Sequence, residues 1–193
     1  MPEYSGVRTF AELLADRRGH LDEPRYAEQV AAIVAAMVAT FRADGKVLWF
    51  GNGGSAADAQ HLAAEFSGRF LRERRGLASE ALTVNTSAVT AIANDFGYEH
   101  LFERMVEALA RRGDTVVGIT TSGTSKNVVR GLEAAKRIGA TTVAFTGNGG
   151  GKVAEIADLV LLGPHGYSAI VQEVHIVMGH IICDLVEQEL IFR

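Results

Sequence analysis

Apolar residues recur at helical spacing in the segment from Pro24 to Asp44. They fall three or four positions apart, which places one face of a helix together: Val30, Ile33, Val34, Met37, Val38 and Phe41. Gly45 stands where a helix terminator is expected. The pattern predicts a long helix over residues 24–44.

Beyond this helix, short apolar runs alternate with further helical patterns. Each run is bounded by glycine or hydroxyl residues, which is typical of buried parallel strands. The predicted strands cover residues 46–50, 81–84, 115–120, 141–146 and 159–162. The predicted helices cover residues 56–70, 87–93, 102–111, 127–138 and 152–157, and a final amphipathic helix covers 168–190. This alternation predicts a doubly wound α/β sheet.

Composition narrows the class of protein. The 193 residues, 48% of them hydrophobic, suffice for one buried core, so we expect a single domain with residues 1–44 as an N-terminal helical segment. A net charge of −4 gives no electrostatic reason to expect nucleic-acid binding, which normally requires a basic surface. The apolar stretches fall short of the roughly 20 residues that cross a bilayer, no leader pattern opens the chain, and the lone Cys183 forms no internal disulfide. We therefore expect a cytoplasmic protein that binds neither nucleic acid nor membranes.

Two loops follow predicted strands and precede helices, the position where doubly wound sheets bind ligands. The sequence GNGGS at 51–55 leaves backbone N–H groups open at a helix start. The sequence TSGTS at 121–125 adds four hydroxyls to a helix start, which favours phosphate. Taken singly, each loop is equally typical of a tight turn or a helix cap.

The first loop also fits a weak dinucleotide fingerprint through Gly51, Gly53 and Ala56. That hypothesis requires an acidic residue at the end of the second strand to bind a ribose, and Asn85 stands there. It also leaves the TSGTS loop without a role, so a nucleotide-dependent oxidoreductase is the weaker interpretation.

Four polar residues on two predicted helices indicate a metal site. His61 and Glu65 lie four residues apart, hence about 40° apart on one helix face. Gln172 and His180 interrupt the apolar face of the final helix, within about 80° of each other. Unpaired buried polar groups cost roughly 1–3 kcal/mol, so these side chains need partners. Two imidazoles, a carboxylate and an amide oxygen suit zinc or a related divalent ion.

Three other features are interpreted as structural. His175 lies about 140° from His180 around the helix and is taken as an ordinary residue. Cys183 sits among apolar neighbours and is predicted to be a core residue. The charged segment FLRERRG at 70–76 is interpreted as a solvated turn between helix and strand.

Several separated motifs, in order, closely resemble the phosphoheptose isomerases, also called sedoheptulose-7-phosphate isomerases, of the sugar-isomerase (SIS) domain family. They are GNGGSAADAQH, TAIANDFGYE, TSGTS, TVAFTGNGGG and the VQE and GH of the last helix. The resemblance implies a flavodoxin-like three-layer α/β/α sandwich with a five-stranded parallel sheet, assembled as a homotetramer. It also implies one zinc ion per subunit and conversion of D-sedoheptulose 7-phosphate to D-glycero-D-manno-heptose 7-phosphate.

The resemblance assigns roles by motif. The implied zinc ligands are His61, Glu65, Gln172 and His180. The implied acid–base residues are Glu65 and His180, with Asp95 as an alternative for part of the proton transfer. The implied substrate contacts, in which the last four hold phosphate, are Glu65, Gln172, Asn52, Gly53, Gly54, Ser55, Asn94, Asp95, Thr120, Thr121, Ser122 and Ser125.

This chain departs from the family pattern at three positions. Thr120 and Thr124 replace serine and a larger polar residue, and Asn85 replaces an aspartate found in many members. Two alternatives therefore stay open. One is isomerisation of another long-chain ketose phosphate, such as an octulose 8-phosphate. The other is a non-catalytic SIS-fold regulator that binds a sugar phosphate or a protein partner.

Overall fold

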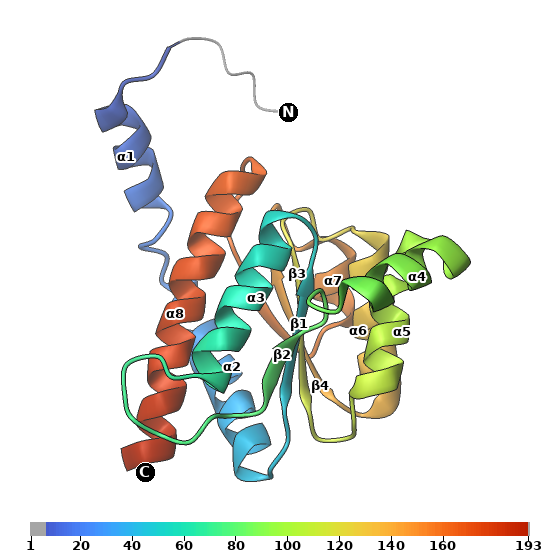
Figure 1. The fold of residues 1–193 in the computed structure, drawn as a ribbon. Helices are drawn as coiled ribbons and strands as arrows, with labels where there is room; N and C mark the ends of the chain where they lie inside the picture. Colours follow the sequence, from blue (N-terminus) through green and yellow to red (C-terminus); the bar gives the residue numbers. More distant parts are fainter. Residues whose placement is uncertain (1–6, 193) are drawn as a thin grey trace.

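The computed structural model describes residues 7–192, in which helices surround one central sheet (Figure 1). The strands are β1 (Val47–Gly51), β2 (Ser79–Ala81), β3 (Thr115–Thr120), β4 (Thr141–Thr146) and β5 (Leu159–Leu162). The helices are α1 (Phe10–Gly19), α2 (Arg25–Arg42), α3 (Gly54–Ser67), α4 (Thr86–Phe96), α5 (Leu101–Leu109), α6 (Lys126–Ile138), α7 (Gly151–Ile156) and α8 (Ser168–Phe192), with a 3-10 turn at Tyr98–His100.

The five strands are parallel in the order β2-β1-β3-β4-β5. This is the flavodoxin-like order, in which the chain reverses its direction of travel between β1 and β3. Gly51, the last residue of β1, pairs with Ile119 of β3, so the loops after these two strands emerge side by side. The predicted three-layer α/β/α sandwich with a five-stranded parallel sheet is confirmed.

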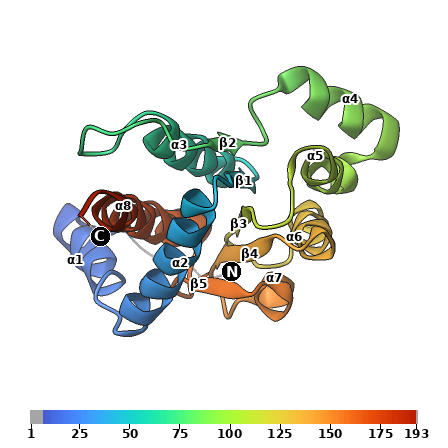
Figure 2. The same ribbon diagram turned by 90° about the horizontal axis from the view of Figure 1, so that it is seen from below.

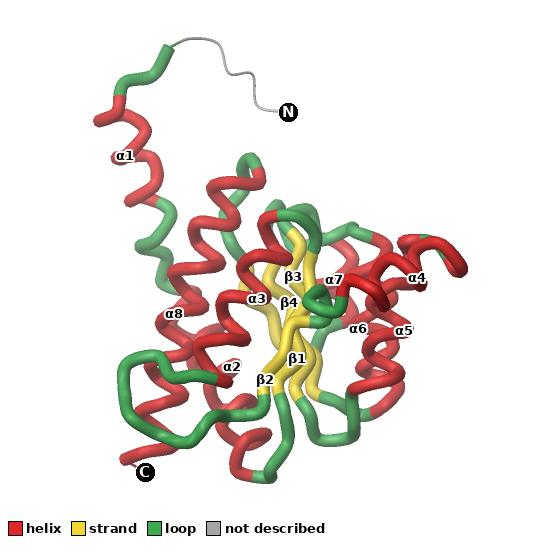
Figure 3. The backbone as a smooth tube through the Cα atoms, viewed as in Figure 1, coloured by secondary structure: helices red, strands yellow, loops and turns green. Residues whose placement is uncertain are grey.

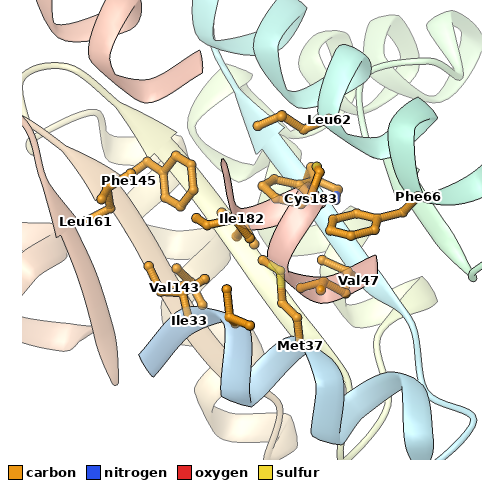
Figure 4. Packing of buried hydrophobic residues seen from close by; sticks show 14 of the residues in the cluster. Ile33, Met37, Val47, Leu62, Phe66, Val143, Phe145, Leu161, Ile182 and Cys183 are labelled. Carbon is orange, nitrogen blue, oxygen red and sulfur yellow. The ribbon is translucent and has the colours of Figure 1, made fainter. Parts of the chain in front are cut away.

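Alternate residues of β1, β3 and β4 enter two separate cores, one on each face of the sheet. Figure 2 shows the helices that cover the two faces. Val47 and Trp49 of β1 point towards α2, α3 and α8, whereas Leu48 and Phe50 point towards α5 and α6. Figure 4 shows the first core, where side chains from α2, α3 and α8 interdigitate with those of the strands. Because both faces of β1, β3 and β4 are buried, their sequences read as nearly continuous apolar runs.

Strand and helix boundaries correct the sequence prediction in two places. The second strand is Ser79–Ala81 and not residues 81–84, because pairing with β1 ends at Ala81 and the chain then turns towards α4. Val84 is consequently exposed. After α2, Asp44 rather than Gly45 adopts the left-handed conformation, with φ of 56°. Gly45 instead approaches Thr40, whose carbonyl oxygen accepts its N–H at 2.9 Å.

The N-terminal helical segment predicted over residues 1–44 consists of two helices, and residues 1–6 lie outside the described part. Thr9 begins α1 with a capping box, in which Glu12 bonds back to the Thr9 backbone. None of the residues of α1 is buried, and in Figure 1 the helix stands away from the sheet. Arg17 ties it to α8 by an ion pair with Glu173 at 3.0 Å.

The charged segment at 70–76 joins α3 to β2 with Leu71, Glu73 and Arg75 exposed, as a solvated turn would, but it is also anchored by a buried carboxylate that the prediction did not include. Glu187 of α8 is fully buried and accepts backbone N–H groups from Phe70, Leu71 and Arg72 at 2.9–3.0 Å. Arg74 Nε lies 2.9 Å from the same carboxylate, and its side chain is 7% exposed. The sequence pattern concealed this arrangement because the acidic partner lies more than a hundred residues away.

Helix α8 extends beyond the predicted range of 168–190. Its apolar stretch is also longer than we expected of any segment of this chain. By length and composition it is the one helix within residues 7–192 that could cross a membrane, although half of its most apolar stretch is buried inside the protein. It packs against α2, α3 and β4 as a core helix does. Its buried residues include the polar His175 and Glu187, whereas the apolar Val177 and Ile181 are exposed.

The buried His175 is paired on one side only. Its Nε2–H donates to the carbonyl oxygen of Thr146 at 3.1 Å, while Nδ1 meets no donor among the described residues. Burial lowers the pKa of His175 to about 4, against 6.5 for a free histidine. Between about pH 4 and pH 6.5 this imidazole is therefore neutral in the folded protein and protonated in the unfolded chain.

A pH dependence of stability follows from His175. Between pH 6.5 and 4 the unfolded chain binds the proton more tightly, so the free energy of unfolding should fall as the pH drops, by on the order of 2–4 kcal/mol. Urea unfolding of the wild type and of His175→Gln at both pH values measures this. The variant should lose this part of the pH dependence, and parallel curves for the two proteins would contradict the assignment.

Candidate active site

Helices α3 and α8 run parallel and close together along one face of the sheet (Figure 1). Their contacts keep a constant offset, from Gly54 with Gln172 at one end to His61 with His180 further along. Gly179 of α8 has no side chain, and a Cβ placed there would lie 2.7 Å from both methyl groups of Leu62 of α3. The missing side chain lets the two helices approach closely.

The close packing brings three of the predicted metal ligands together. His61 Nε2 lies 2.8 Å from His180 Nε2 and 3.4 Å from Glu65 Oε1. One potential ligand atom from each of the three residues lies within 4.8 Å of the others. The His61 side chain is 50% exposed, so the cluster opens to solvent. These nitrogen and oxygen donors fit the coordination chemistry of zinc.

The side chain of Gln172, on α8, lies against the beginning of α3. A Cβ on Gly54 would lie 2.7 Å from both its Oε1 and its Nε2, so the amide rests directly against this glycine. Gly54 precedes His61 by about two helical turns. The structure therefore joins Gln172 to the GNGGS loop, and its role as a fourth metal ligand stays a prediction.

Two residues that the sequence did not single out, Asn127 and Tyr98, bind the GNGGS loop through Asn52. Asn52 and the buried Asn127 exchange two side-chain hydrogen bonds of 2.9 and 2.8 Å. The hydroxyl of Tyr98 also donates to Asn52 Oδ1, at 2.9 Å. Asn52, Tyr98, Ser125 and Asn127 line a cavity of about 570 Å³. No spacing signal links Asn127 to Asn52, since they follow different strands.

The loop TSGTS presents its hydroxyls to one another at the same edge of the sheet. Thr120 Oγ1 lies 2.9 Å from Ser125 Oγ and 3.4 Å from Ser122 Oγ. Gly123 has φ of 71° and packs against Gly150, whose carbonyl oxygen would lie 2.1 Å from a Cβ. No Ser125 side-chain bond caps α6, so this hydroxyl is not used as an ordinary N-cap. The loop has the features of a phosphate cradle.

Helix α4 carries the remaining predicted substrate contacts. Asn94 and Asp95 are exposed, and the Asn94 amide donates to Asp95 at 2.8 Å. Asn85 begins the same helix, where its side chain accepts the backbone N–H of Ala88 at 3.1 Å. The departure at Asn85 is thus used as a helix cap, a role that aspartate fills equally well.

Asp58 is a further titratable group beside the cluster. It lies one helical turn before His61, and its Oδ2 is buried without a hydrogen-bond donor in residues 7–192. Burial raises the pKa of Asp58 to about 6, opposed by the nearby His61. Burial also raises the pKa of Cys183 well above its usual value, and Cys183 is a core residue as expected.

Comparison with known proteins agrees with this architecture. Residues 17–147 match the SIS domain family. The chain is 57% identical to a phosphoheptose isomerase of Aquifex aeolicus, over 84% of this chain and 85% of the relative. It is 46% identical to that of Rhodospirillum rubrum, over 95% and 97%. The structure of phosphoheptose isomerase from Neisseria gonorrhoeae superposes with a TM-score of 0.85, at 42% identity, over 91% and 96%.

The fold, the paired loops and these matches place the chain in the SIS domain family. Within it, the chain belongs to the phosphoheptose isomerases. It is therefore an enzyme, of the aldose–ketose isomerase class. The alternative of a non-catalytic regulator is set aside.

The contact at Gly179 makes a testable prediction. Gly179→Ala should lower the free energy of unfolding by roughly 1–3 kcal/mol through overpacking against Leu62. It should also weaken zinc binding by about tenfold, because the imidazoles move apart. Urea unfolding and chelator competition measure the two effects. Gly19→Ala, which meets nothing within 4 Å, is the control and should change neither; wild-type zinc affinity in Gly179→Ala would contradict the interpretation.

Proposed function

We propose that the protein converts D-sedoheptulose 7-phosphate to D-glycero-D-manno-heptose 7-phosphate, with one zinc ion per subunit. The observation that carries this proposal is the convergence of His61, Glu65 and His180 on one point, in a chain that is 57% identical to a phosphoheptose isomerase. The GNGGS and TSGTS loops account for the phosphorylated end of the sugar. The cluster accounts for the carbonyl end.

The reaction moves a carbonyl from C2 to C1 through an enediol. A base removes a proton from C1, a proton returns to C2, and the oxygen atoms exchange theirs. Glu65 is the base at carbon, and His180 is the acid–base partner at oxygen. Glu65 is partly buried whereas Asp95 lies on the exposed α4, which supports Glu65 for the step at carbon.

His61, Glu65 and His180 would hold the zinc ion, with the amide oxygen of Gln172 as a fourth donor. When bound, zinc supplies Lewis-acid polarisation of the substrate oxygens. A carboxylate bound to a cation is a weaker base than a free one. Glu65 has two carboxylate oxygens, so in this proposal it would both help to hold the ion and take the C1 proton.

The phosphate is held by Thr120, Thr121, Ser122 and Ser125. Hydroxyls and backbone N–H groups at the start of α6 donate to its oxygens. Asn52, Gly53, Gly54 and Ser55 line the path between the phosphate and the cluster, and Asn94 and Asp95 contact the sugar from α4.

The protein acts as a homotetramer in the cytoplasm, with its sites near subunit contacts. Exposed apolar side chains support self-association: Val177 and Ile181 of α8 face solvent in the single chain, and α1 buries no residue of its own. Covering such groups with another copy removes apolar surface from water.

Incubation of the purified protein with D-sedoheptulose 7-phosphate tests the proposal. We expect D-glycero-D-manno-heptose 7-phosphate to form, most of the turnover to disappear after dialysis against a chelator, and zinc to restore it. A parallel incubation with an octulose 8-phosphate measures the alternative substrate, and faster turnover of it would reassign the sugar. Conversion of neither compound would refute the proposed function.

Two kinds of variant separate chemistry from phosphate binding. Glu65→Gln keeps the size of the side chain but removes the base, so kcat should fall by roughly 10²–10⁴-fold while phosphate still binds. Ser125→Ala removes one hydroxyl donor, so KM should rise by about tenfold with kcat retained. Steady-state kinetics with titration of inorganic phosphate measures both. Substantial turnover by Glu65→Gln would remove Glu65 from the base role.

A further inference from the structure

A buried charge lies beneath the loop that joins α3 to β2. Figure 3 shows this loop, residues 68–78, running across the C-terminal half of α8. Glu187 of α8 accepts the backbone N–H groups of Phe70, Leu71 and Arg72. Burial by itself raises the pKa of Glu187, but these hydrogen bonds and the charge of Arg74 outweigh it and hold the pKa below its usual value. The carboxylate is therefore a fixed negative charge that holds the loop.

Arg74 connects the same carboxylate to the end of α3. Its guanidinium lies against Glu187 and donates to the carbonyl oxygens of Glu65 and Phe66, both at 2.8 Å, and of Gly68 at 3.1 Å. The last carbonyls of a helix have no partner within the helix and carry its negative dipole end. Arg74 satisfies them at the turn that carries Glu65.

Phe70 extends this arrangement to the metal cluster. Its ring stacks on the imidazole of His180, with centroids 5.5 Å apart and planes inclined by 23°. The same imidazole meets the ring of His61, with centroids 5.0 Å apart and planes inclined by 66°. His180 thus contacts both a phenyl ring and another histidine. Its Nε2 is directed at His61.

We infer that Phe70 is a positioning residue for His180, and that the buried Glu187–Arg74 pair fixes Phe70 and the end of α3 in one unit. The inference rests on the proposed function, since the value of a fixed His180 lies in binding zinc and moving protons. The two halves of the site stand on different helices, α3 and α8. The loop at 68–78 is the covalent continuation of one helix that is hydrogen-bonded to the other.

An ordinary loop would need no such partners. An exposed turn leaves its N–H groups to water, and burying a carboxylate beneath it costs free energy unless every lone pair is used. The neighbouring Arg69–Glu73 pair is the ordinary case, with its side chains 64% and 88% exposed. The contrast shows that Glu187 is placed for the loop and not for general solubility.

Phe70→Leu tests the positioning role, since leucine keeps the apolar contact but removes the flat ring. We expect zinc affinity, measured by competition with a chromophoric chelator, to fall on the order of tenfold. The kcat for the sugar phosphate should fall with it while KM stays near the wild-type value, because the phosphate loop is untouched. Phe70→Tyr retains the ring and should restore both quantities.

Glu187→Gln tests the unit, with Glu73→Gln in the same loop as its matched control. Glu187→Gln should speed amide hydrogen exchange at Phe70, Leu71 and Arg72 and weaken zinc binding to the level of Phe70→Leu. Glu73→Gln should leave both unchanged. If Glu187→Gln does not fold, the Phe70 variants alone decide the question.

The outcomes separate this inference from the proposed function. Equal zinc affinity in Phe70→Leu and the wild type, no zinc binding by the wild type, or an equal loss in Phe70→Tyr overturns the inference. A wild type that does not isomerise D-sedoheptulose 7-phosphate refutes the proposed function. In that case weaker zinc binding by Phe70→Leu still supports the positioning role, because affinity is measured without turnover.

Discussion

The geometry of the site depends on how closely α3 approaches α8 at Gly179. Leu62 fills the space that a side chain at this position would occupy, and the helices run parallel at a constant offset. Because the helices are parallel, His61, the residue before Leu62, lies beside His180, the residue after Gly179. A metal site requires donors placed to within a fraction of an ångström, and side chains on rigid helices meet that requirement better than side chains on loops. The core and the cluster are therefore formed by the same contact.

The candidate site has two parts, which are the loops that follow β1 and β3 and the cluster of His61, Glu65 and His180 on the flanking helices. Because β1 and β3 are neighbours, the loops that follow them lie together, and the Asn52–Asn127 hydrogen bonds lock their relative position. Gln172, which rests on Gly54, connects the first of these loops to α8. Under the proposed function, the charged end and the carbonyl end of a sugar phosphate would be recognised by these different elements.

The buried charges of Glu187 and Arg74 fix the positions of nearby backbone segments. Glu187 and Arg74 form several hydrogen bonds to backbone groups, and these bonds together offset the cost of desolvating the two charges. His175, by contrast, is buried as a neutral group with one hydrogen bond. The exposed ion pairs at the surface, such as Arg69 with Glu73, add little to stability by comparison.

Local patterns predicted the fold and the helix faces that carry the candidate site. Apolar runs and helical spacing located the strands and helices, and spacing alone paired His61 with Glu65 and Gln172 with His180. The sequence did not reveal the start of β2, the helix α1, the cap formed by Asn85, the Asn52–Asn127 bonds or the role of Glu187. Periodicity reports which residues share a face, because that depends on neighbours in the chain. Which faces meet depends on packing between segments far apart in sequence, and only the tertiary structure decides it.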